Sequence, residues 1–147
     1  MLNLTQDFKD FLKLLTENHA RYLIIGGYAV GYYGYPRATA ELDIWVEINQ
    51  ENAKALVNTI TNFGFSKTDV KEGDFLKEGK IIRMGFPPFR IEIITSISGV
   101  TFEDCYKRKL EIEEQGIKIC LISREDLIEN KKAAGRFKDK ADLEKLE

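Results

Sequence analysis

The chain has 147 residues, a net charge of −2 and 44% hydrophobic side chains. This length fits one ordinary domain spanning 1–147, and the apolar fraction excludes a largely disordered chain. The slight acidic excess argues against a protein that binds nucleic acid regardless of sequence, because such proteins carry a basic surplus.

The reactive side chains are few. Cys105 and Cys120 lie too far apart for a Cys-x-x-Cys motif, so we expect two reduced, mostly buried thiols. His19 is the single histidine, which leaves almost no material for a zinc site or a Ser-His-Asp triad. No apolar run approaches the roughly 18 residues that cross a bilayer, and the N-terminus lacks a signal-peptide pattern. We therefore expect a cytoplasmic protein without a membrane partner.

The N-terminal third of the chain alternates between helix and strand patterns. Apolar residues at helical spacing predict an amphipathic helix over 5–18. The apolar run 22–25 predicts a buried strand that ends in a tight Gly-Gly turn. A short helix is expected over 29–33, before Gly34-Tyr35-Pro36 breaks it.

The middle of the chain begins with strict alternation. Leu42, Ile44, Val46 and Ile48 alternate with a second set of residues, which predicts a strand; that set is Glu41, Asp43, Trp45 and Glu47. Asn49 is typical of a helix cap, and the helix that follows should end near Gly64. The polar segment 66–79 is expected to form a loop or a weak hairpin.

The remaining segments are again mixed. Strands are expected over 81–84, 90–94 and 117–121, and helices over 101–110, from 123 through about 134, and over 139–146, with Gly135 between the last two. The order of elements predicts an α+β fold with one mixed sheet flanked by helices.

Two carboxylates on the first alternating strand carry the chemistry. Glu41 and Asp43 are two residues apart, so both side chains project from the same face of the strand. Adjacent carboxylates repel each other, and a divalent cation relieves that repulsion; oxygen ligands suit magnesium. The alternative is a solvated strand face near the edge of a sheet.

A third acid lies in a later strand. Glu92 is placed between isoleucines in the run Arg90-Ile91-Glu92-Ile93-Ile94. If this strand lies beside the first, Glu92 completes a site at which shared carboxylates hold two metal ions for phosphoryl transfer. The alternative is a salt bridge from Glu92 to a nearby Arg or Lys.

Three further segments have the residue types that bind phosphate. Gly26 and Gly27 follow a buried strand, where the backbone can approach an anion at the start of the next helix. Arg37 and Thr39 precede the acidic strand and offer a guanidinium and a hydroxyl, unless they make ordinary loop contacts. Lys131 lies on an apolar helix face within a basic run, and its ammonium could point inward to a phosphate. The alternative is that the whole basic run is a solvated helix face.

These motifs together resemble the nucleotidyltransferase superfamily that includes DNA polymerase beta. The family pattern is a hydrophobic residue, two small residues, a gap, and an acid–hydrophobic–acid–hydrophobic strand, with a third acid later. Here it reads Ile25-Gly26-Gly27, Glu41-Leu42-Asp43-Ile44 and then Glu92. Within the superfamily the chain most resembles the small bacterial AbiEii-like and minimal nucleotidyltransferases of toxin–antitoxin and phage-defence systems, through segments 35–39 and 131–139.

The resemblance implies a nucleotidyltransferase-like sheet with C-terminal helices and transfer of a nucleoside monophosphate. Glu41, Asp43 and Glu92 would bind Mg²⁺ or Mn²⁺ and act as catalytic residues. Gly26, Gly27, Arg37, Thr39 and Lys131 would bind ATP or another nucleoside triphosphate. The acceptor would be a protein, such as a cognate toxin or antitoxin, or an RNA such as tRNA.

The sequence departs from the family at two acids, because Glu41 and Glu92 stand where aspartates are usual. A glutamate places its carboxylate one methylene further out, and magnesium requires near-ideal octahedral geometry. Three hypotheses follow: an active nucleotidyltransferase, a catalytically weakened regulator that binds nucleotide or a partner, and a purely structural domain.

Overall fold

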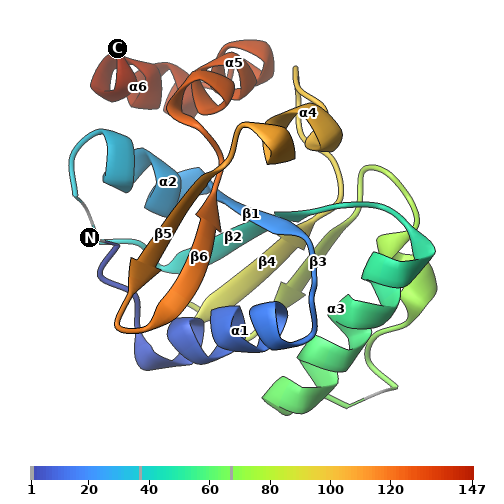
Figure 1. The fold of residues 1–147 in the computed structure, drawn as a ribbon. Helices are drawn as coiled ribbons and strands as arrows, with labels where there is room; N and C mark the ends of the chain where they lie inside the picture. Colours follow the sequence, from blue (N-terminus) through green and yellow to red (C-terminus); the bar gives the residue numbers. More distant parts are fainter. Residues whose placement is uncertain (1, 37, 67) are drawn as a thin grey trace.

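The computed structural model describes residues 2–36, 38–66 and 68–147. A six-stranded mixed sheet forms its centre, in the order β3-β4-β2-β1-β6-β5 (Figure 1). The strands are β1 (Tyr22–Ile25), β2 (Glu41–Val46), β3 (Ile81–Met84), β4 (Arg90–Ile94), β5 (Leu110–Glu114) and β6 (Ile117–Leu121). Two neighbouring pairs, β2 with β4 and β1 with β6, are parallel, and the other three are antiparallel. The predicted α+β class is confirmed.

The helices pack around this sheet. They are α1 (Gln6–Glu17), α2 (Gly26–Tyr33), α3 (Gln50–Phe63), α4 (Phe102–Lys107), α5 (Arg124–Ala134) and α6 (Phe137–Leu146), with the 3-10 turn η1 (Glu72–Phe75). Helices α1 and α3 pack against each other, while the C-terminal pair α5 and α6 packs together and against α2 (Figure 1). None of the helices in the described ranges combines the length and apolar character needed to cross a bilayer.

Local sequence signals place several element ends. Thr5 and Asn49 accept hydrogen bonds from the first turns of α1 and α3, so both predicted helices begin where a capping side chain stands. Ser123 caps α5 in the same way, and Gly135 ends it in the left-handed conformation. Both cysteines, Cys105 and Cys120, are buried and unpaired, as expected.

Two predicted boundaries and one predicted loop need correction. Helix α2 begins at Gly26 rather than at Ala29, because Gly26 has a positive φ of 67° and turns the chain from strand to helix within one residue. The helix predicted to reach Leu110 ends at Lys107, and Leu110 instead opens β5. The segment 66–79 contains η1.

The alternation of β2 and β4 separates the core from the site. Leu42, Ile44, Ile91 and Ile93 are at most 2% exposed and pack into the hydrophobic core. The residues between them, including Asp43, are only partly buried and face the opposite side of the sheet. The sheet therefore presents its polar row to one cleft.

Candidate metal and phosphate site

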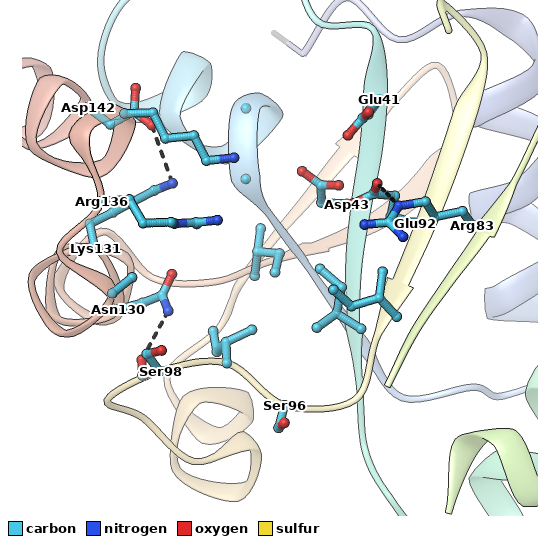
Figure 2. A pocket seen from close by; sticks show the side chains of 18 of the residues that line it. Glu41, Asp43, Arg83, Glu92, Ser96, Ser98, Asn130, Lys131, Arg136 and Asp142 are labelled. Atoms are coloured by element: carbon cyan, nitrogen blue, oxygen red, sulfur yellow. Dashed lines mark hydrogen bonds and ion pairs between the residues drawn. The ribbon is translucent and has the colours of Figure 1, made fainter. Parts of the chain in front are cut away.

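The structure brings the three predicted acids together. Asp43 and Glu92 are direct neighbours in the parallel pair β2–β4, and Glu41 lies two residues before Asp43 on the same face. One carboxylate oxygen from each residue lies within 4.8 Å of the other two. Figure 2 shows the three carboxylates on adjacent strands at one end of the cleft. This separation allows all three to bind one small cationic centre.

The carboxyl group of Asp43 has a strongly shifted pKa. Burial, the largest cause, and the charges of Glu92 and Glu41 together raise the pKa of its carboxyl to about 7. Among the described residues, no donor reaches Asp43 Oδ1, although that oxygen is buried. A buried oxygen without a partner is destabilising. The donor set is therefore one that a divalent cation fits, because the cation would satisfy this oxygen and offset the repulsion.

Each glutamate also has an arginine partner. Arg83 Nε on β3 lies 2.9 Å from Glu92 Oε1, and Arg90 Nη1 lies 3.3 Å from Glu41 Oε1. The salt bridge considered as the alternative role of Glu92 is thus present in this structure. It involves one of the two carboxylate oxygens, so it does not by itself prevent Glu92 from acting at a metal.

The backbone of Gly26 packs directly against the Asp43 carboxylate. A Cβ atom at this position would overlap the Asp43 carboxylate, and its φ of 67° is one that side-chain-bearing residues rarely adopt. Gly26 and Gly27 open helix α2, whose first N–H groups have no partners within the helix. Both glycines line the cleft beside Asp43. The backbone and the acids are therefore adjacent, as phosphate and metal binding require.

We expect Gly26→Ala to disrupt the site beyond the effect of backbone strain alone. A methyl group would push the Asp43 carboxylate away in addition to the roughly 1 kcal/mol cost of a left-handed non-glycine residue. The expected loss of unfolding free energy is about 2 kcal/mol or more, measured by urea denaturation. Gly116→Ala is the matched control, because Gly116 has a φ of 79° and open space at its Cβ position. Equal losses for both variants would contradict the proposed contact.

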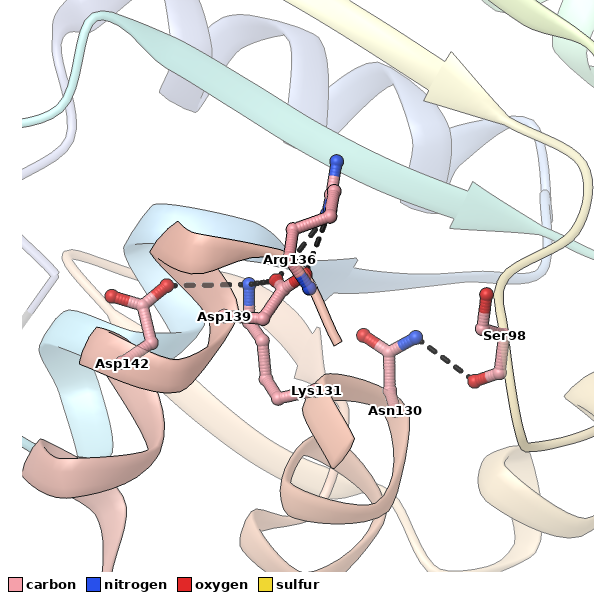
Figure 3. A network of polar contacts seen from close by, with 6 residues as sticks. All are labelled: Ser98, Asn130, Lys131, Arg136, Asp139 and Asp142. Atoms are coloured by element: carbon pink, nitrogen blue, oxygen red, sulfur yellow. Dashed lines mark hydrogen bonds and ion pairs between the residues drawn. The ribbon is translucent and has the colours of Figure 1, made fainter. Parts of the chain in front are cut away.

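A basic wall faces the acids across the cleft. Arg136 and Lys138, at the start of α6, line the same cleft as Asp43. The positive charge of Lys138 lowers the pKa of Asp43, although burial and the two glutamates outweigh it. Arg136 also donates to Asp139, with Nε 2.7 Å from Oδ2 (Figure 3). An anion bound between the walls would meet cations on one side and helix N–H groups on the other.

Lys131 has a different place from the one predicted. It lies at the cleft wall but is 6% exposed, and its ammonium is 3.2 Å from Asp139 Oδ1 and 3.3 Å from Asp142 Oδ2 (Figure 3). Its helix face is buried, as expected, but the charge is held by acids of α6. Sequence reasoning selected the buried lysine, whereas the exposed Lys138 faces the acids. The sequence contains a sign of this arrangement, because a buried ammonium requires nearby carboxylates and Asp139 and Asp142 follow in the chain.

The two remaining predicted residues lie elsewhere. Arg37 is outside the described residues. Thr39 lines a small separate hollow with Gly27 and Tyr28, beside α2 rather than beside the three acids. Of the predicted phosphate-binding residues, Gly26, Gly27 and Lys131 therefore line the cleft that holds the three acids.

The cleft between these walls has a volume of about 760 Å³. Sites for small ligands and cofactors usually fall between about 300 and 1,000 Å³. A nucleotide-sized ligand therefore fits the space. Its walls combine an acidic cluster, a basic cluster and a glycine-opened helix, which is an arrangement for a ligand that is both anionic and metal-bound.

Comparison with known proteins shows the fold. The chain is similar to the crystal structure of an antigenic nucleotidyltransferase-like protein from Paracoccidioides brasiliensis, with a TM-score of 0.53 and 16% sequence identity. The likeness covers 97% of this chain and 75% of that chain. Neither a family model nor a curated protein matches the chain. At this identity the likeness establishes the fold, and the predicted nucleotidyltransferase-like fold is confirmed.

Proposed function

We propose that this chain, as one domain spanning 1–147, transfers a nucleoside monophosphate from a nucleoside triphosphate to an acceptor hydroxyl. The observation that carries the proposal is the buried, unpartnered Asp43 oxygen among three converging carboxylates. Such a cluster is unstable by itself and becomes favourable with a bound Mg²⁺ or Mn²⁺. Glu41, Asp43 and Glu92 would hold the ion, which when bound polarises phosphate oxygens and stabilises developing negative charge.

The other residues of the cleft would hold the triphosphate. The N–H groups at Gly26 and Gly27 would donate to phosphate oxygens, and Lys138 with Arg136 would neutralise charge from the opposite wall. In this proposal Lys138, and not Lys131, contacts the phosphates, because the ammonium of Lys131 is paired with Asp139 and Asp142.

The transfer step would join the acceptor oxygen to the α-phosphorus and break the bond between that phosphorus and the pyrophosphate oxygen. Glu92 would accept the proton of the acceptor hydroxyl through the carboxylate oxygen that Arg83 does not contact. Pyrophosphate would leave toward the basic wall. The proposed acceptor is a protein side chain or an RNA end such as that of tRNA. The proposed setting is the toxin–antitoxin or phage-defence role implied by the AbiEii-like resemblance.

The proposal is tested with α-labelled nucleoside triphosphates. The purified protein is incubated with each of the four triphosphates, with Mg²⁺ or Mn²⁺, and with total tRNA, a neighbouring-gene protein or no acceptor. We expect label to appear on one acceptor together with pyrophosphate, and EDTA to remove both. A γ-labelled triphosphate should leave no label on the acceptor. Label transfer that persists in EDTA would contradict a metal-dependent mechanism.

A second candidate is a regulator that binds nucleotide or a partner without turnover. The contacts of Arg90 with Glu41 and of Arg83 with Glu92 favour it, because an arginine at each glutamate competes with a cation. It predicts triphosphate binding without release of pyrophosphate. The double variant Glu41→Asp, Glu92→Asp would withdraw both carboxylates from the arginines, and a gain of transfer in that variant would favour this candidate.

A further inference from the structure

The cleft changes from charged to apolar along strand β4. Glu92 and Ile94 project from the same face, about 7 Å apart, because two residues of a strand span that length. On the neighbouring strand β3, Arg83 pairs with Glu92 and Ile81 pairs with Ile94. A charged row is therefore followed directly by an apolar row, and both line the cleft.

The apolar row continues onto a fixed loop. Ile97 lines the cleft in the loop that follows β4. Ser98 of this loop accepts a hydrogen bond from Asn130 Nδ2 of α5 at 3.0 Å, and Gly99 packs so closely on α5 that a Cβ would overlap Ala133. Figure 2 shows Ser96 and Ser98 at the end of the cleft away from Glu41. The apolar half is thus formed by the paired strands β3 and β4 and by a loop that α5 holds in place.

We propose that this apolar half, formed by Ile81, Ile94 and Ile97, binds the nucleobase of the triphosphate whose phosphates occupy the charged half. The inference rests on the proposed function, because it takes the position of the phosphates from the metal and phosphate site. A nucleoside triphosphate has the same polarity as the cleft, with charged phosphates at one end and a flat, largely apolar base at the other. Covering the half-exposed Ile81 with a base removes apolar surface from water, which favours binding.

The position of Trp45 provides a direct reporter. It is the single tryptophan of the chain and pairs in register with Ile94, two residues after Asp43 on β2. Its indole is buried against Phe102, with ring centroids 5.2 Å apart. A base bound over Ile94 would change the surroundings of this indole, so intrinsic fluorescence should follow occupation of the apolar half.

The test separates base binding from phosphate binding. Each of the four nucleoside triphosphates and inorganic tripolyphosphate is titrated into the full chain with Mg²⁺, by calorimetry and by Trp45 fluorescence. We expect at least one nucleotide to bind roughly tenfold more tightly than tripolyphosphate. Ile81→Thr should weaken that nucleotide roughly fivefold and leave tripolyphosphate unchanged, since it removes part of one apolar contact. Ile81 is 47% exposed on an edge strand, so this variant should fold.

Leu110→Thr is the matched control, because Leu110 is a similarly exposed residue on β5, the opposite edge strand. It should change neither affinity. If tripolyphosphate binds as tightly as every nucleotide and Ile81→Thr changes neither, the base site is overturned while the phosphate site stands. If neither tripolyphosphate nor any nucleotide binds in Mg²⁺, the proposed function fails and this inference fails with it.

Discussion

Replacing Asp43 by asparagine will abolish metal-dependent nucleotidyl transfer while making the metal-free protein more stable. Activity should fall by roughly 100-fold or more, because removal of a central charge-stabilising group typically has that effect. The melting temperature should rise by a few degrees, about 2–4 °C for each kcal/mol recovered. The rise follows from removing a buried charge that Glu92 and Glu41 repel. Label transfer and differential scanning calorimetry measure the two effects.

The gain in stability should depend on pH. The folded protein holds a proton on Asp43 up to about pH 7, whereas the unfolded chain releases it near the ordinary pKa of 3.8. Between these values the folded state binds more protons, so this group lowers stability as the pH rises through that window. The difference in melting temperature between Asp43→Asn and the wild type should therefore be small near pH 4 and largest above pH 7.

Asp69→Asn is the control, because Asp69 is an exposed aspartate in the loop after α3. It should leave transfer and the pH profile unchanged. Adding Mg²⁺ should raise the melting temperature of the wild type and of Asp69→Asn, but not that of Asp43→Asn. An Asp43→Asn protein that is less stable than the wild type at pH 8 would show that Asp43 is a structural ion-pair partner instead of a strained metal ligand.

The sequence predicts part of the acidic site but not all of it. Alternation in β2 was sufficient to place Glu41 and Asp43 on one face, because a strand has a period of two residues. The sequence does not predict which strand lies beside β2, so a role for Glu92 at this site depends on β4 being that neighbour. Parallel pairing of β2 with β4, which sets Glu92 beside Asp43, joins segments about 50 residues apart and leaves no local mark. Long-range pairing of this kind depends on the whole core.

Strand β5 was missed for a different reason. Leu110 and Ile112 alternate with Glu111 and Glu113, which is a strand pattern, but the helix predicted from Thr101 covers Leu110, where this strand begins. The structure joins β5 to β6 through Gln115 and Gly116, which both have positive φ. Two such residues form the tight turn of a hairpin. The alternation and the Gln-Gly pair together were the available signal.

The position of a charged residue on a helix does not identify its partner, as the basic run around Lys131 shows. Helical spacing predicts a buried face for Lys131, and the structure confirms it, but the burial of a lysine does not by itself indicate contact with a ligand. In the structure Asp139 and Asp142 supply the compensating charge from α6. The spacing of Asp139 and Asp142 puts both on one helix face, but only the angle between α5 and α6 decides that this face meets Lys131. Interhelical geometry of this kind is not encoded locally.

Replacing Lys131 by methionine will cause the largest loss of stability among single side-chain changes at the cleft. Burial by itself would raise the pKa of Asp139, but the hydrogen bonds from Arg136 and Lys131 outweigh it and lower that pKa to about 2. Removing one partner of a buried ion pair typically costs about 3–5 kcal/mol, because a charge is left uncompensated. Urea denaturation at pH 7 should show a loss of this size, and transfer should fall because α6 positions Arg136 and Lys138.

Lys132→Met is the matched control one residue away. Lys132 is exposed and its ammonium lies 3.7 Å from the carboxylate of Glu147, so its loss should change stability by less than about 1 kcal/mol. The deficit of Lys131→Met should also shrink as the pH falls from about 4 toward 2, because Asp139 then takes up a proton and no longer needs an ammonium. If Lys131→Met is as stable as Lys132→Met but no longer binds tripolyphosphate, Lys131 contacts phosphate directly and the originally predicted role is restored.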